Sequence, residues 1–121
     1  MKNCICIYSK KLIDLSDGVK SLKKTSHRGP DNLGYWVNKE KTLFLGHNRL
    51  SIIDVSSISN QPMIDNDTGM VITFNGEIYN YKDIREQLVK LGVKFKSSSD
   101  TEVLIKAIAF WGKDALDKFT G

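Results

Sequence analysis

The feature that most constrains the fold is a change of hydrophobic spacing near residue 75. Before it, short runs rich in β-branched and aromatic residues alternate with polar turns, which is typical of strands. After it, apolar residues recur every three or four positions, which is typical of amphipathic helices. Strands followed by helices predict an α+β fold in which the helices pack on one side of the sheet.

The first part of the chain is expected to hold four strands and one helix. We expect a short, largely buried strand at 4–8, a hairpin whose strands flank a turn at 38–41, and a strand at 70–74. A helix is expected from Ser16, although Gly18 lowers its helix propensity. The segment 26–34 is expected to be loop because Pro30 and two glycines interrupt it.

The sequence after residue 75 predicts helices. Asn80 is a plausible N-cap of a helix that stops at Gly92 and carries Ile84, Leu88 and Leu91 on one face.

A brief strand at 93–96 is expected next. Ser99 and Glu102 then form a capping-box pattern that begins the clearest helix, which runs to Trp111, and residues 114–119 add a final helical piece.

Composition narrows the classes of function. A chain of 121 residues suits one domain, and its lysines are scattered, so the net charge of +4 does not predict nucleic-acid binding. No apolar run approaches the ~20 residues of a membrane span and no secretory signal is present, so we expect a cytoplasmic protein with reduced thiols. Two cysteines and two histidines make a weak zinc set, and no metal site is expected.

Three polar segments interrupt the packing pattern. Arg49 sits in a strand-like run, where it either reaches solvent, pairs with Asp54, or grips a ligand carboxylate bidentately. Asn75 and Gly76 form a hairpin-turn sequence, but an amide beside an open glycine N–H also suits a developing oxyanion. Asp100 begins the clearest helix, where it either offsets the helix dipole or holds a ligand ammonium. Spacing alone favours the structural interpretation of each.

Five ordered blocks carry a resemblance: HRGPDNLGYW, LGHNRLSIIDVS, QPM, FNGEIYNY and SDTEVL. Together they resemble the glutaminase domain of glutamine-hydrolysing asparagine synthase, a class II glutamine amidotransferase, over residues 27–121. The resemblance implies the N-terminal-nucleophile fold, a four-layer αββα sandwich of which residues 1–121 are the first part only. It also implies that the ATP-dependent synthetase domain is absent, and that ATP and Mg²⁺ belong to that domain, so that no cofactor is expected in this one.

The resemblance assigns residues to the amino-acid end of a bound glutamine. Arg49 would hold the α-carboxylate, and the backbone around Ile52 and Ile53 would line the same pocket. Glu77 and Asp100 would hold the α-ammonium. A zwitterionic ligand needs these opposite charges, so the separate signals support one another.

The resemblance also implies the reacting end. Asn75 and the N–H of Gly76 would form the oxyanion hole. The family's nucleophile is the cysteine directly after the initiator methionine, whose own α-amine is the general base once the methionine is removed. Lys2 occupies that position here, and Cys4 becomes terminal only if Met-Lys-Asn is cleaved.

We therefore expect an amidotransferase domain that is impaired or inactive as a glutaminase. The alternatives are an active glutaminase matured to Cys4, and a non-catalytic glutamine-binding or structural module. The expected partners are glutamine and the synthetase domain of the same parent protein, with neither nucleic acid nor membrane. An incomplete sandwich would expose sheet edges and an apolar face, so we also expect self-association into a homo-oligomer.

Overall fold

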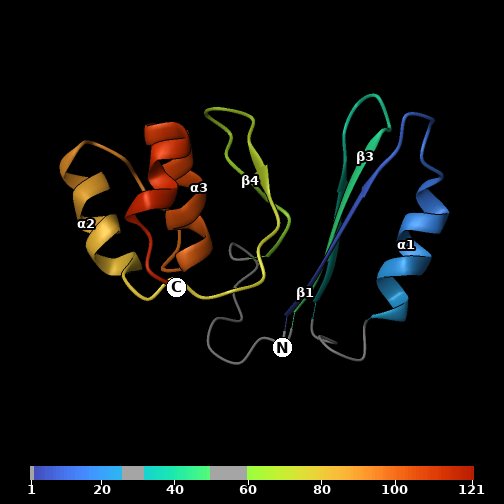
Figure 1. Cartoon of the computed structure of the whole chain (residues 1–121), viewed down its shortest axis with the longest axis horizontal. Helices are drawn as coiled ribbons and strands as arrows, with labels where there is room; N and C mark the ends of the chain where they lie inside the picture. Colours follow the sequence, from blue (N-terminus) through green and yellow to red (C-terminus); the bar gives the residue numbers. More distant parts are fainter. Residues whose placement is uncertain (1, 26–31, 50–59) are drawn as a thin grey trace.

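The computed structural model describes residues 2–25, 32–49 and 60–121, with the backbone alone at residues 2, 3, 32 and 49. Figure 1 shows the arrangement of these parts. The elements in chain order are β1 (Lys2–Tyr8), α1 (Leu15–Lys24), β2 (Asn32–Val37), β3 (Leu43–Arg49), β4 (Met63–Ile64), β5 (Val71–Ile72), α2 (Tyr81–Lys90), α3 (Asp100–Trp111) and the 3₁₀ helix η3 (Gly112–Lys118).

β1, β3 and β2 form an antiparallel sheet with β3 in the centre. The predicted turn at 38–41 joins β2 to β3. It is held by Asn38, whose Oδ1 accepts hydrogen bonds from the backbone N–H groups of Thr42 and Leu43 at 2.9 and 2.8 Å. An asparagine that bonds to its own turn in this way fixes the register of the hairpin.

α1 covers one face of this sheet. Leu22 of α1 and Phe44 of β3 are both fully buried there. A Cβ at Gly18 would lie only 2.8 Å from the ring of Phe44, so the glycine lets the helix approach the sheet. The residue that lowers the helix propensity of 15–24 is therefore the one that allows α1 to pack.

The opposite face of the sheet meets the segment that carries β4 and β5. These two strands pair antiparallel and lie between the three-stranded sheet and helices α2 and α3 (Figure 1). Two contacts join the parts. The hydroxyl of Thr73 lies 3.3 Å from the sulfur of Cys4, and the carbonyl oxygen of Gln61 occupies the space where Gly34 would carry a side chain.

The last third of the chain packs around its own apolar cluster. Its buried members come from α2, α3 and η3 and are Ile84, Leu88, Val103, Ala107 and Ala115. The Oγ of Ser99 accepts a hydrogen bond from the N–H of Glu102 at 3.2 Å, so the predicted cap of α3 is confirmed. The carboxylate of Glu102 bonds instead to the N–H groups of Lys96 and Ser97, which leaves the predicted capping box half formed.

Several predictions about elements were wrong. Residues 32–34 belong to β2 rather than to a loop, because they pair with β3. β1 is not largely buried: Cys6 is exposed and Tyr8 is 72% exposed, and Cys4, Ile5 and Ile7 are only half-buried.

The second half also differs in detail. Residues 93–96 form no strand, and Phe95 instead packs its ring 4.5 Å from the guanidinium of Arg85. Asn80 makes no side-chain cap, because its amide bonds to the backbone of Lys118 and Thr120. Leu91 is the C-cap of α2 and is 54% exposed, whereas Ile84 and Leu88 on the same predicted face are buried.

The predicted α+β class is confirmed by this mixture of small sheets and helices. None of the helices within the described ranges is long and apolar enough to span a bilayer.

Candidate functional site

The segment 74–78 connects β5 to the approach of α2 and carries three of the predicted site residues. Asn75 and Glu77 are exposed, and Gly76 is half-buried. A Cβ at Gly76 would lie 2.9 Å from the ring of Phe74, so the backbone crosses this ring where a side chain would be crowded. The chain continues into α2 and does not return as a strand, so Asn75 and Gly76 are not a hairpin turn.

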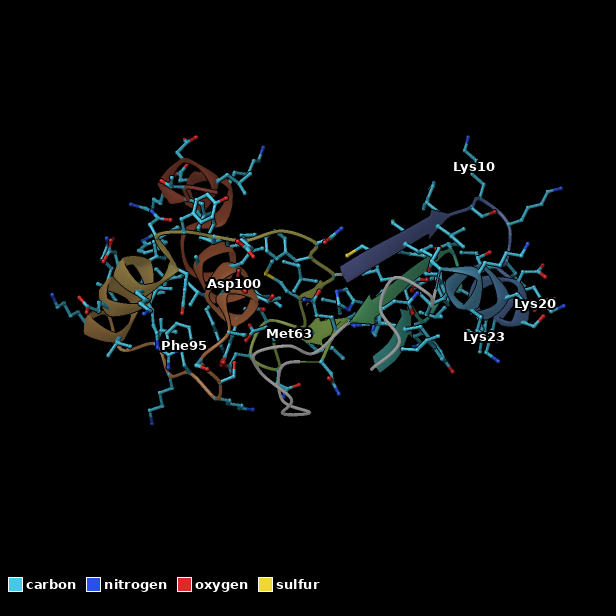
Figure 2. All side chains as sticks on the ribbon, turned by 90° about the horizontal axis from the view of Figure 1, so that it is seen from below. Lys10, Lys20, Lys23, Met63, Phe95 and Asp100 are labelled. Atoms are coloured by element: carbon cyan, nitrogen blue, oxygen red, sulfur yellow. The ribbon has the colours of Figure 1, made fainter. Side chains whose placement is uncertain are left out.

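Asp100 is the first residue of α3 and reaches back to this segment. Its Oδ2 accepts a hydrogen bond from the N–H of Ile78 at 3.2 Å. A helix N-terminus stabilises a carboxylate, so the position suits a charged group. Figure 2 shows Asp100 on the opposite side of the molecule from Lys10, Lys20 and Lys23, so these surface lysines take no part in the site.

Arg49 is the last residue of β3. The register places its Cα opposite Lys2 of β1 and opposite Asn32 of β2. Lys2, rather than Cys4, is therefore level with Arg49 across the sheet. Ile52 and Ile53, predicted to line the pocket, lie outside the described residues.

Cys4 lies further along β1, opposite His47. Cys4 is half-buried and Cys6 is exposed, and the two cysteines are not joined by a disulfide. Thr73, whose hydroxyl contacts the Cys4 sulfur, stands two residues before Asn75. Cys4 therefore lies near the strand that leads into the site, but as an interior residue of its own strand. Across the described parts of the chain, no cluster of three or more His, Cys, Asp or Glu side chains could hold a metal ion.

A second polar cluster joins the β4–β5 turn to α3. The Nζ of Lys106 bonds to Asp65 at 2.6 Å, and the hydroxyl of Thr68 donates to the other oxygen of Asp65 at 2.5 Å. Burial raises the pKa of the Asp65 carboxyl, but the bonds from Lys106 and Thr68 outweigh it, so the pKa lies below its ordinary value. The bond to Asp65 raises the pKa of Lys106.

A pocket of about 280 Å³ opens beside this cluster, between the β4–β5 turn and α3. Its charged lining includes Lys106, which is already paired with Asp65, and Glu102, which already accepts from backbone N–H groups. Lys94 and Lys96 also line the pocket, which includes none of the predicted site residues.

Gln61 is a buried polar residue beside the site that sequence reasoning did not assign a role. It was noticed only within the block QPM, because a glutamine before a proline is ordinary loop sequence. Its hydrogen-bond partners lie 13 and 40 residues away in the chain, which no local spacing reveals.

Comparison with known protein families identifies the family of this chain, which the geometry of the site alone does not. A family model described as a glutamine amidotransferase domain matches residues 1–121. The chain belongs to this family. The membership agrees with the resemblance carried by the five sequence blocks, which is thereby confirmed.

Relatives of this amidotransferase domain include three much longer proteins. Asparagine synthetase [glutamine-hydrolyzing] 1 of Bacillus subtilis is 43% identical over 95 residues, covering 78% of this chain and 15% of the relative. Asparagine synthetase [glutamine-hydrolyzing] 3 of the same organism is 34% identical over 117 residues, covering 94% and 19%. Amidase chry2 of Gibberella zeae is 39% identical over 101 residues, covering 84% and 15%. The chain thus spans less than a fifth of each of these relatives.

Proposed function

We propose that residues 1–121 are the front part of an amidotransferase domain that binds glutamine and whose glutaminase activity is impaired. The observation that carries the proposal is the sheet register, in which Lys2 is level with Arg49. The residue at the family's nucleophile position is therefore beside the expected carboxylate-binding arginine, and in this chain it is a lysine.

The binding chemistry follows from the groups available. The Arg49 guanidinium can pair with the α-carboxylate of glutamine, helped by the backbone at Ile52 and Ile53. Asp100 can hold the α-ammonium with the carboxylate oxygen that does not bond to Ile78, and the exposed Glu77 offers a second anion.

The reacting amide of glutamine would lie at the opposite end of the ligand from its α-carboxylate and α-ammonium. The Asn75 amide and the Gly76 N–H are the donors proposed for its carbonyl oxygen.

Hydrolysis of that amide needs a nucleophile that this site lacks. In the family reaction a thiolate attacks the amide carbon, the C–N bond breaks as ammonia leaves, and water then cleaves the thioester to give glutamate. Lysine, the residue type at position 2, supplies no thiol for this attack. Cys4 has its nitrogen in a peptide bond within β1, and an amide nitrogen cannot act as the base.

The proposal extends to the parent protein. A synthetase domain using ATP and Mg²⁺ would follow in the same cytoplasmic polypeptide, and further strands would complete a four-layer αββα sandwich. The parent would then use free ammonia to amidate its acceptor, or use this domain to cap the synthetase.

A glutaminase assay on the parent protein tests the missing nucleophile. We expect no glutamate release above background from the wild type, and a gain with Lys2→Cys once intact mass confirms loss of Met1. Lys2→Ser is the matched control, because it also exposes a free α-amine but supplies no thiol. Robust release by the wild type overturns the proposal.

The contact between Cys4 and Thr73 favours testing one alternative, a glutaminase matured to Cys4. Intact mass of the protein made in its native host decides it. A chain that begins at Cys4 supports maturation, whereas a chain that begins at Met1 excludes it.

Calorimetry with glutamine tests binding separately from hydrolysis. We expect the wild type to bind and Arg49→Ala to lose binding, with Arg49→Lys weakened because lysine cannot form the bidentate pair. If the wild type gives no binding heat, the structural-module alternative is favoured instead.

A further inference from the structure

The side chain of Gln61 bridges the two segments that carry the candidate site. It is 4% exposed. Its Oε1 accepts a hydrogen bond from the backbone N–H of Phe74 at 2.6 Å, and its Nε2 donates to the hydroxyl of Thr101 at 3.2 Å. Phe74 directly precedes Asn75, and Thr101 directly follows Asp100. One buried amide therefore touches the neighbours of two proposed site residues.

A third hydrogen bond closes a ring. Asp100 accepts from the N–H of Ile78, four residues beyond Phe74. The segment 74–78 is thus attached to the start of α3 at both of its ends, by Gln61 at one and by Asp100 at the other. The residues between the two attachments are Asn75, Gly76 and Glu77.

The backbone of Gln61 contacts the three-stranded sheet as well. Its carbonyl oxygen lies against Gly34, where any Cβ would collide with it. Gly34 pairs with His47, two residues before Arg49 in β3. Gln61 therefore contacts the sheet that ends in Arg49, the segment that carries Asn75, and the helix that begins with Asp100.

We propose that Gln61 is a positioning residue, which sets the separation between the donors at Asn75 and Gly76 and the carboxylate of Asp100. This inference rests on the proposed binding of glutamine, whose amide and α-ammonium would occupy those two places. A primary amide suits the task because it offers an acceptor and a donor at fixed separation. A shorter asparagine would not span both partners, and a glutamate would bury a charge.

Two substitutions break the bridge without large changes of shape. Gln61→Met keeps the length of the side chain and removes both hydrogen bonds. Thr101→Val removes only the partner of Nε2, and Thr101→Ser is its matched control, because it retains the hydroxyl. All variants are compared in the full chain, with folding checked by circular dichroism.

The ligands are glutamine and 4-carbamoylbutanoate, which is glutamine without its α-ammonium. A residue that only stabilises the fold would affect both ligands alike, whereas a positioning residue matters most for the ligand that occupies both ends. We expect Gln61→Met to weaken the binding of glutamine about tenfold, which corresponds to the loss of about one hydrogen bond. The variant should also show a smaller preference for glutamine over 4-carbamoylbutanoate. Thr101→Val should reduce the affinity and the preference for glutamine in the same direction but by less. Thr101→Ser should bind both ligands with the wild-type preference.

An unchanged preference in a folded Gln61→Met variant overturns the inference, and so does equal weakening of both ligands. If the wild type binds neither ligand, the proposed function is wrong independently of Gln61. Hydrogen exchange then tests whether Gln61 holds the segment 74–78 in place. We expect Gln61→Met to accelerate exchange in a peptide covering residues 74–79 by about tenfold relative to α2, because the N–H of Phe74 loses its buried acceptor. Unchanged exchange there overturns the bridging role.

Discussion

Among single residues, the pair formed by Asp65 and Lys106 shows how a charge is kept in the interior of so small a protein. The side chain of Asp65 is 2% exposed and that of Lys106 is 17% exposed. The carboxylate is tolerated because it receives bonds from an ammonium and a hydroxyl at once. The pair holds the β4–β5 turn against α3, the helix that begins with Asp100.

Lys106→Met is expected to destabilise the protein by about 3 kcal/mol, because it leaves the buried Asp65 carboxylate without its counter-ion. Urea denaturation at neutral pH measures the loss. Asp67→Asn is the matched control: Asp67 lies 3.5 Å from the same ammonium but is 87% exposed, so its removal should change stability little. Equal effects of the two substitutions would contradict this account.

The pH dependence of the pair follows from the directions of its pKa shifts. The folded-state pKa of Asp65 is lowered, so its contribution is present above about pH 4 and is lost as the pH falls through the folded pKa. The folded-state pKa of Lys106 is raised, so its contribution is complete below about pH 10 and is lost as the pH rises through the raised folded-state pKa. The stability difference between wild type and Lys106→Met should therefore be constant from about pH 5 to 9 and shrink below pH 4.

Among the elements, the helices and the hairpin could be predicted because their signals are local. The period of apolar residues gives α3, Ser99 gives its cap, and the turn begun by Asn38 gives the hairpin. The failures have long-range causes. Asn80 bonds to Lys118 and Thr120, some 40 residues away, in place of capping α2. Residues 93–96 have the composition of a strand but meet no partner strand.

The packing of α1 and its helix propensity predict opposite effects on stability for a substitution at Gly18. Alanine is the better helix former by about 1 kcal/mol, yet Gly18→Ala should destabilise the protein by about 1–2 kcal/mol, since the new methyl group would press into the buried ring of Phe44.

Urea denaturation again provides the measurement, with Lys20→Ala as the control at an exposed position of the same helix. That control should stay within about 0.5 kcal/mol of wild type. A stabilised Gly18→Ala would mean that α1 lies further from the sheet than described.

At the scale of the whole molecule, the candidate site is assembled from parts that the sequence keeps far apart. The family resemblance predicts the roles of Arg49, Asn75 and Asp100, whereas spacing alone favours a structural interpretation of each. Gln61 and the bond from Ile78 to Asp100 join the segments that carry Asn75 and Asp100, and the β1–β3 register places Arg49 level with Lys2. These contacts come from tertiary packing, so no periodicity in the chain reports them.

The predicted self-association also belongs to this scale. Within the described residues, β1 and β2 are the edges of their sheet, and Tyr8 and Leu12 are 72% and 76% exposed beside the β1 edge. Sedimentation velocity in reducing buffer should show a mass that rises with concentration, and Tyr8→Lys should reduce this rise because a lysine opposes strand addition at the edge.

Leu116→Lys is the matched control, since Leu116 is also exposed but lies on η3, away from the sheet. A compact monomer at every concentration would contradict the expectation, as would an equal response to both substitutions.

The double attachment of segment 74–78 has a consequence for chain length. Insertions are tolerated where the ends of a loop can move apart, but here both ends are joined to the first turn of α3. One extra residue between Asn75 and Glu77 would have to bulge outward or detach one end. The spacing of residues in this loop is therefore as restricted as their identity, and a family member with a longer loop here would need a different bridge in place of Gln61.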